Sequence, residues 1–153
     1  MLKKISIIEN KKLLQFEEEE EETSKEVGIR VLLVEDDDFL RDICEIKLRK
    51  EGFDVATSSD GLDAFKKIKD TKPQLVLLDV ILPGMDGFDI LKQTKENIET
   101  ALIPIIMLTN LGQDNEVKKG LDMGAEDYII KAHFTVDEIV EKVRSIIKKK
   151  KIK

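Results

Sequence analysis

This 153-residue chain has little cysteine and no long apolar run, and each of these absences excludes a class of protein. The single cysteine, Cys44, excludes an internal disulfide, and its place in a helical apolar pattern predicts a buried core residue. No apolar run approaches the ~20 residues that a membrane-spanning helix needs. The first residues also lack the long apolar stretch of a secretion signal. We therefore expect a cytoplasmic protein without membrane insertion.

Charged residues, in contrast, make up 38% of the chain, and the formal net charge is -6. This acidic balance argues against nucleic acid as a direct partner. Residues 1–28 contain the acidic run Glu17–Glu22 after several apolar positions, and they predict a charged extension that is partly disordered or docks on a surface. We expect a single domain at residues 29–148, followed by a basic tail at residues 149–153.

From Ile29 onward, short apolar runs alternate with segments whose apolar residues recur every three or four positions. The runs predict five strands: Ile29–Val34, Phe53–Thr57, Gln74–Leu78, Pro104–Leu108 and Asp127–Ile130. The periodic segments predict five helices: Phe39–Lys50, Leu62–Lys69, Phe88–Ile98, Glu116–Met123 and Thr135–Ile147. This alternation predicts an α/β fold, a doubly wound parallel sheet with strand order 2-1-3-4-5.

Some helix ends carry recognisable signals. Thr135, with Glu138 three residues later, has the pattern of a capping box. Asp38 suits the N-cap of the first helix. On apolar spacing, Leu62 and Ile98 are expected on the buried faces of their helices.

Acidic residues follow two of the predicted strands. Asp79 comes directly after the apolar run Leu75–Leu78, and Glu35, Asp36 and Asp37 follow the first strand. In the order 2-1-3-4-5 these two strands are neighbours, and their carboxyl ends meet at the point where such sheets bind ligands. A cluster of carboxylate oxygens suits Mg²⁺, which often accompanies phosphate. This pattern predicts phosphoryl chemistry at an aspartate.

Four motifs stand at strand ends in a specific order: Val34-Glu35-Asp36-Asp37, Asp79 with Pro83-Gly84-Met85-Asp86-Gly87, Leu108-Thr109 and Tyr128-Ile129-Ile130-Lys131. With these motifs, the chain from about Ile29 to Ile147 resembles the receiver domain of two-component response regulators, of the single-domain type found among chemotaxis regulators. The resemblance implies a flavodoxin-like fold and a signalling role rather than that of an enzyme.

The resemblance also implies which residues bind metal and phosphate. Asp79 would be the phosphoryl acceptor. Asp36, Asp79 and the backbone carbonyl of Ile81 would bind Mg²⁺ or Mn²⁺ directly, and Glu35 would act through a water molecule.

Further residues would hold the phosphoryl group or respond to it. Thr109 and Lys131 would contact it through their side chains, and Tyr128 would move inward when Thr109 shifts. The backbone N–H groups of Ile81 and Asn110 would also face its oxygens.

Two departures bear on the alternatives. Ala132 follows Lys131 where the family usually has a proline, which leaves open a receiver-like scaffold that does not take phosphate. A phosphatase that passes through an aspartyl-phosphate needs a second acid two residues after the nucleophile, and Ile81 stands there. A nucleotide or flavin module is disfavoured because no glycine-rich loop follows the first strand.

The resemblance implies a sensor histidine kinase or a histidine phosphotransfer protein as phosphoryl donor. A downstream protein would bind the face formed by the fourth helix, fifth strand and fifth helix, and the chain would be a monomer or a phosphorylation-linked dimer. The only histidine, His133, is expected to be a loop residue rather than a phosphorelay histidine.

Overall fold

The computed structural model describes residues 28–153, in which short apolar segments pair into one parallel sheet. The strands are β1 (Arg30–Val34), β2 (Asp54–Ser58), β3 (Leu75–Leu78), β4 (Ile105–Thr109) and β5 (Asp127–Ile130). Their order is β2-β1-β3-β4-β5, which confirms the predicted topology. Val34 pairs with Leu78 in the register of β1 and β3, so the residue after each strand lies at the same edge of the sheet.

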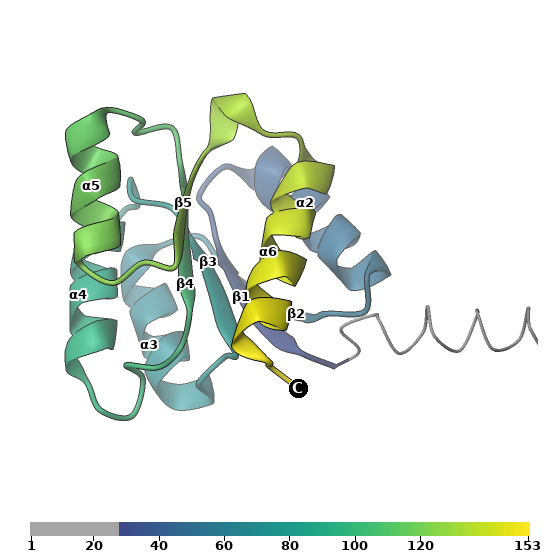
Figure 1. The fold of residues 1–153 in the computed structure, drawn as a ribbon, viewed down its shortest axis with the longest axis horizontal. Coiled ribbons are helices and arrows are strands. Elements are labelled where there is room, and N and C mark those ends of the chain that lie inside the picture. The colour runs from purple at the N-terminus through teal and green to yellow at the C-terminus, as the bar shows by residue number, and fades with distance from the viewer. Residues whose placement is uncertain (1–27) are drawn as a thin grey trace, which may run out of the picture.

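Helices connect successive strands, as the right-handed crossovers of parallel sheets require. They are α2 (Asp38–Lys50), α3 (Gly61–Thr71), α4 (Gly87–Glu96), α5 (Asp114–Asp122) and α6 (Val136–Lys150), with a 3-10 turn, η1 (Lys131–His133), after β5. Helices α2 and α6 cover one face of the sheet, and α3, α4 and α5 cover the other (Figure 1).

The core of residues 28–153 consists of two apolar clusters, one on each face of the sheet. All four residues of β3 are buried, because this central strand is covered by helices on both sides. Cys44, 1% exposed, packs in the cluster under α2 and α6, which confirms its prediction as a core residue. Each fully buried leucine contributes roughly 1.5–3 kcal/mol relative to an exposed one. Apolar packing on both faces therefore stabilises the sheet that carries the carboxyl edge.

The predicted cap of the first helix is one residue off. Asp37, not Asp38, is the N-cap of α2, since its Oδ1 accepts a hydrogen bond from the Leu40 N–H at 3.0 Å. Asp38 is the first helical residue and forms an ion pair with Arg41 at 2.6 Å. The Thr135–Glu138 capping box at the start of α6 is confirmed.

Two expected core residues are exposed instead. Helix α4 ends at Glu96, so Ile98 lies in the following turn and is 92% exposed. Leu62 is 63% exposed because its neighbour Gly61 is the residue that packs against the β3–α4 loop. A Cβ on Gly61 would lie 1.7 Å from the carbonyl oxygen of Met85. Apolar spacing does not reveal so close a backbone contact.

The expected charged extension falls almost wholly on residues 1–27, which lie outside the described residues. Among the described residues, no helix is long and apolar enough to cross a bilayer. Helix α6 continues to Lys150, so the expected basic tail begins within its last turn.

Candidate functional site

Three carboxylates meet at the carboxyl edge of the sheet. Glu35 follows β1, Asp36 comes next, and Asp79 follows β3. Oxygen atoms of the three side chains all lie within 4.8 Å of one another. Glu35 and Asp79 are buried, whereas Asp36 is exposed. The pairing of β1 with β3 therefore brings together the acids that the sequence predicts to share one crevice.

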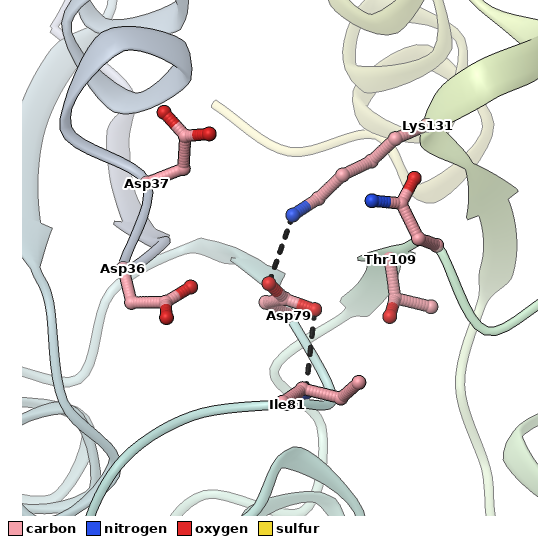
Figure 2. Close-up of a pocket in the computed structure, with 7 residues that line it drawn as sticks. Asp36, Asp37, Asp79, Ile81, Thr109 and Lys131 are labelled. Carbon is pink, nitrogen blue, oxygen red and sulfur yellow. Dashed lines mark hydrogen bonds and ion pairs between the residues drawn. The ribbon is translucent and has the colours of Figure 1, made fainter.

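A lysine ammonium reaches into this acidic cluster from the turn after β5. Lys131 Nζ donates a hydrogen bond to Asp79 Oδ2 at 2.8 Å (Figure 2). The same ammonium also forms an ion pair with Glu35. Lys131 begins the turn η1, and its side chain is only 13% exposed. Ala132 and His133 complete this turn with exposed side chains. Lys131 thus contacts Asp79 although alanine, not proline, follows it in this chain.

A cavity of about 410 Å³ opens above these groups. Its lining residues come from the end of β4 and from the loops after β1, β3, β4 and β5: Asp36, Asp37, Asp79, Ile81, Thr109, Asn110 and Lys131. Figure 2 shows that Asp36, Asp79, Thr109 and Lys131 approach the cavity from different elements. Four strands therefore contribute to one polar pocket that a small anion and a cation could enter.

Burial and charge shift the pKa values of two of these groups. Burial, aided by the neighbouring Asp79, raises the pKa of Glu35 to about 7, although Lys131 acts in the opposite direction. Burial alone would lower the pKa of the Lys131 ammonium, but its hydrogen bonds to Asp79 and Glu35 outweigh burial and raise it. At neutral pH the lysine is therefore charged, while Glu35 is divided between its protonated and its charged form.

The backbone around Asp79 is held by close packing. The Ile81 N–H donates to Asp79 Oδ1 at 3.3 Å, and the Gly87 N–H donates to the Val80 carbonyl at 2.8 Å. A Cβ on Gly87 would lie only 2.1 Å from the Asp79 carbonyl oxygen. Glycine at this position therefore allows α4 to begin directly against the backbone of the candidate acceptor.

Thr109 and Tyr128 both contact the backbone of Leu111. The buried Thr109 Oγ1 accepts a hydrogen bond from the Leu111 N–H at 3.3 Å, and the Tyr128 hydroxyl donates to the Leu111 carbonyl at 2.5 Å. Tyr128 is not among the residues that line the cavity. Burial raises its pKa to about 12, with a smaller contribution from Glu116, so the hydroxyl keeps its proton and remains a donor.

Several supporting residues were missed by the sequence reasoning. Arg41 donates to the Glu35 carbonyl at 2.9 Å and so holds the acidic loop from α2. Asp37 lines the cavity in addition to capping α2. Gly61 and Gly87 each follow an aspartate that caps a helix, and this repeated Asp-Gly pair is the signal that could have revealed both close contacts.

Comparison with known proteins gives this site a family context. The model of the family described as "Response regulator receiver domain" matches residues 31–144. Among curated relatives, the DNA-binding dual master transcriptional regulator RpaA of Synechocystis is 36% identical over 120 residues, covering 78% of this chain and 49% of the relative. The transcriptional regulatory protein AfsQ1 of Streptomyces coelicolor is 42% identical over 101 residues, covering 66% and 44%. The chain thus spans about half the length of these relatives.

Solved structures agree with this match along most of their length. The signal receiver domain of a putative Luxo repressor protein from Vibrio parahaemolyticus gives a TM-score of 0.75 at 31% identity, covering 82% of this chain and 95% of that chain. A putative response regulator from Chloroflexus aurantiacus gives 0.72 at 33% identity, covering 78% and 98%. The chain therefore belongs to the response regulator receiver domain family of two-component signalling, a signalling module rather than a classical enzyme.

Proposed function

We propose that this chain is a phosphoacceptor response regulator and that Asp79 takes a phosphoryl group from a histidine kinase or a histidine phosphotransfer protein. Receiver domains partner histidine kinases, which agrees with this donor class. The observation that carries the proposal is the hydrogen bond of 2.8 Å between Lys131 Nζ and Asp79 Oδ2, beside an acidic cluster and an open cavity.

The proposed reaction is an in-line phosphoryl transfer between two side chains. A carboxylate oxygen of Asp79 attacks the phosphorus of a phosphohistidine, so that a P–O bond forms as the P–N bond breaks. The electron pair of the broken bond leaves with the donor imidazole. Lys131 offsets negative charge on Asp79 and on the incoming group, because its ammonium already lies on the carboxylate.

The acidic triad is typical of the Mg²⁺ site of receiver domains, and its chemistry fits a hard divalent cation. Lys131 is the one ammonium group among the described residues that line the cavity, and of the three carboxylates it contacts Glu35 and Asp79. The cluster is therefore left with an excess of negative charge. We propose that Asp36, Asp79 and the Ile81 carbonyl hold Mg²⁺ or Mn²⁺, with Glu35 acting through water. The ion would supply neutralisation of the phosphoryl oxygens.

The proposed output begins at Thr109. Its hydroxyl, now bonded to the Leu111 N–H, would instead donate to an oxygen of the phosphoryl group on Asp79. The N–H groups of Ile81 and Asn110, at the same cavity, would face the remaining oxygens. Tyr128 holds the other side of Leu111, so loss of the threonine contact would alter the loop that leads into α5.

This chain of contacts supports a readout on the face formed by α5, β5 and α6. A downstream protein would bind this face when Thr109 and Tyr128 change their contacts with the β4–α5 loop. We place the protein with its kinase in the cytoplasm, as a monomer or a phosphorylation-linked dimer without direct nucleic acid binding.

Intact mass after incubation with Mg²⁺ and acetyl phosphate tests the proposal. We expect one added phosphoryl group in the wild-type chain, none in Asp79→Asn and none in the presence of a chelator. Asp70→Asn is the matched control because Asp70 is exposed on α3, away from the cavity, and it should be phosphorylated normally. An adduct retained in Asp79→Asn would contradict the assignment of the acceptor.

The absence of any adduct would favour the alternative, a receiver-like scaffold that does not take phosphate. A parallel Mg²⁺ titration makes this outcome specific. Binding of Mg²⁺ without phosphorylation would locate the defect in the turn that begins at Lys131, where Ala132 replaces the usual proline.

A further inference from the structure

A second cleft lies at the opposite, amino edge of the sheet from Asp79. Its volume is about 410 Å³, and its lining includes Pro73 and Gln74 before β3, Leu102 and Pro104 before β4, and Ile152 after α6. Five of the eight lining residues are apolar, and the other three are Gln74, Glu99 and Lys150. An apolar cleft at this edge serves no step of the proposed phosphoryl transfer.

Side-chain hydrogen bonds hold the turn between α4 and β4, which forms one wall of this cleft. The Thr100 hydroxyl donates to the Thr94 carbonyl at 2.8 Å. Lys95 Nζ donates to the carbonyls of Ala101 and Ile103 at 3.1 and 2.6 Å. These bonds fix the turn between α4 and β4, yet Leu102 within it is 95% exposed. A large apolar side chain presented on a fixed turn is a preorganised contact, which lowers the entropy cost of binding.

The lining carries one charge of each sign, Glu99 and Lys150, and Lys150 forms an ion pair with Glu126 at 2.7 Å. The excess of positive charge comes from the tail beside the cleft, where five of the last six residues of the chain are lysines. Lys148, Lys149 and Lys151 are exposed at the end of α6. The cleft therefore combines an apolar floor with an adjoining positive surface and suits a segment in which apolar residues stand next to acidic ones.

The chain itself contains such a segment. Leu13, Leu14 and Phe16 are followed directly by the six glutamates Glu17–Glu22. This segment joins the domain at the same edge of the sheet as the cleft. Where β1 begins, the Arg30 N–H donates to Gln74 Oε1 at 3.0 Å, and Gln74 lines the cleft.

The connecting chain is long enough to reach. Strands β1 and β4 are separated by two strand spacings, about 10 Å in all. Gly28 follows Phe16 by twelve positions, a stretch that can span up to about 40 Å when extended. The connecting chain is therefore long enough for Phe16 to contact the cleft of the same molecule.

We propose that this cleft is the docking site for residues 1–27 of the same chain. Leu13, Leu14 and Phe16 would occupy the apolar floor around Leu102, and Glu17–Glu22 would lie against the lysines of the tail. The inference does not depend on phosphorylation of Asp79, and docking would leave the cavity at the other edge of the sheet open.

Paramagnetic broadening in the full chain tests the proposal. A nitroxide is attached at Gln15→Cys of ¹⁵N-labelled protein, next to the proposed apolar contacts. We expect the amide signals of Leu102, Ile103 and Ile152 to lose most of their intensity, while that of Asn110 at the opposite edge keeps it. Cys44 is 1% exposed and should escape labelling, which the wild-type chain treated with the same reagent checks.

Two variants in the labelled background separate the apolar and the charged contributions. Leu102→Asp should restore the lost signals, whereas Ile46→Asp, a matched change of another exposed apolar residue on α2, should not. Reversal of Lys148, Lys149 and Lys151 to glutamate should also restore them. Reversal of three exposed lysines elsewhere, Lys66, Lys69 and Lys92, should have no effect.

Three results would overturn the proposal. One is unchanged intensity at Leu102 in the labelled chain. Another is broadening at Ile103 and Ile152 that survives Leu102→Asp. The third comes from a mixture of nitroxide-bearing ¹⁴N chain and unmodified ¹⁵N chain: broadening there would show contact between copies, not within one chain.

Discussion

At the scale of single residues, Glu35 is the group whose protonation state matters most. It is 1% exposed and beside Asp79, so burial and a like charge raise its pKa to about 7. Lys131 stays positively charged over the same range, because its own pKa is raised. The charge of the candidate metal site therefore changes near neutral pH through one residue. Cation binding there must compete with a proton on Glu35.

We predict that Mg²⁺ affinity falls as the pH drops below about 7, by up to about tenfold per pH unit, because the protonated carboxyl must lose its proton for the site to hold the cation fully. Calorimetric titration at several pH values measures this. Glu35→Gln should bind Mg²⁺ more weakly at high pH and with much less pH dependence. An equally steep dependence in Glu35→Gln would assign the titration to another group.

Tyr128 offers a second residue-level test, because the chain has one tyrosine and no tryptophan. Its ring lies against Gly120, where a Cβ would come 2.9 Å from Tyr128 Cδ2. We predict that Gly120→Ala displaces the ring and increases quenching of tyrosine fluorescence by acrylamide. The gain in helix propensity, about 1 kcal/mol, does not prevent this, since overpacking costs roughly 1–3 kcal/mol.

Asn115→Ala is the control for this variant, because Asn115 is exposed on the same helix and the change also favours the helical state. Its quenching should match that of the wild-type chain. Equal quenching in Gly120→Ala would show that α5 moves to accommodate the methyl group and that the ring stays in place.

At the scale of elements, the strands were predictable and several local contacts were not. Continuous apolar runs mark strands covered on both faces, and β3 is buried at all four positions. The prediction of which helix face is buried was less reliable. Ile98 continues the apolar spacing of α4 but lies beyond the end of the helix, which stops at Glu96. Leu62 has the right spacing, yet backbone contact at Gly61 decides which residue of α3 faces inward.

The site shows the same division. The acids after β1 and β3 could be brought together from strand order alone, because the topology rule makes those strands neighbours. The contact between Tyr128 and Leu111 could not be predicted from the sequence. It is a hydrogen bond between a side chain and a loop carbonyl seventeen residues away. Apolar periodicity carries no information about such a contact.

The start of α6 gives an element-level prediction. The Thr135 hydroxyl accepts from the Glu138 N–H at 3.2 Å, and the Glu138 side chain accepts from the Thr135 N–H at 3.1 Å. We predict that Thr135→Ala lowers the free energy of unfolding by about 1 kcal/mol, because an N–H group of the first turn loses its partner. Urea denaturation measures the change. Ser145→Ala, exposed within the same helix, should stay within about 0.5 kcal/mol of the wild type.

At the scale of the whole molecule, the fold concentrates negative charge at one edge of the sheet. Parallel pairing places Glu35, Asp36 and Asp79 within 4.8 Å, and Lys131 compensates only part of their charge. These four residues follow β1, β3 and β5, which lie in different parts of the sheet. A cation bound there would stabilise the folded chain as a whole, since the unfolded chain does not bring the three carboxylates together.

We therefore predict that Mg²⁺ raises the melting temperature of the wild-type chain. At about a hundred times the dissociation constant, binding adds about 2.7 kcal/mol to the free energy of unfolding, which for a domain of this size corresponds to about 5–10 °C. Differential scanning calorimetry with and without Mg²⁺ measures the shift. In Asp36→Asn, which removes an exposed carboxylate of the triad without opening a cavity in the core, the shift at the same Mg²⁺ concentration should largely disappear. If Asp36→Asn kept the full shift, the stabilising cation would have to bind outside this triad, and the assignment of Asp36 as a ligand would be wrong.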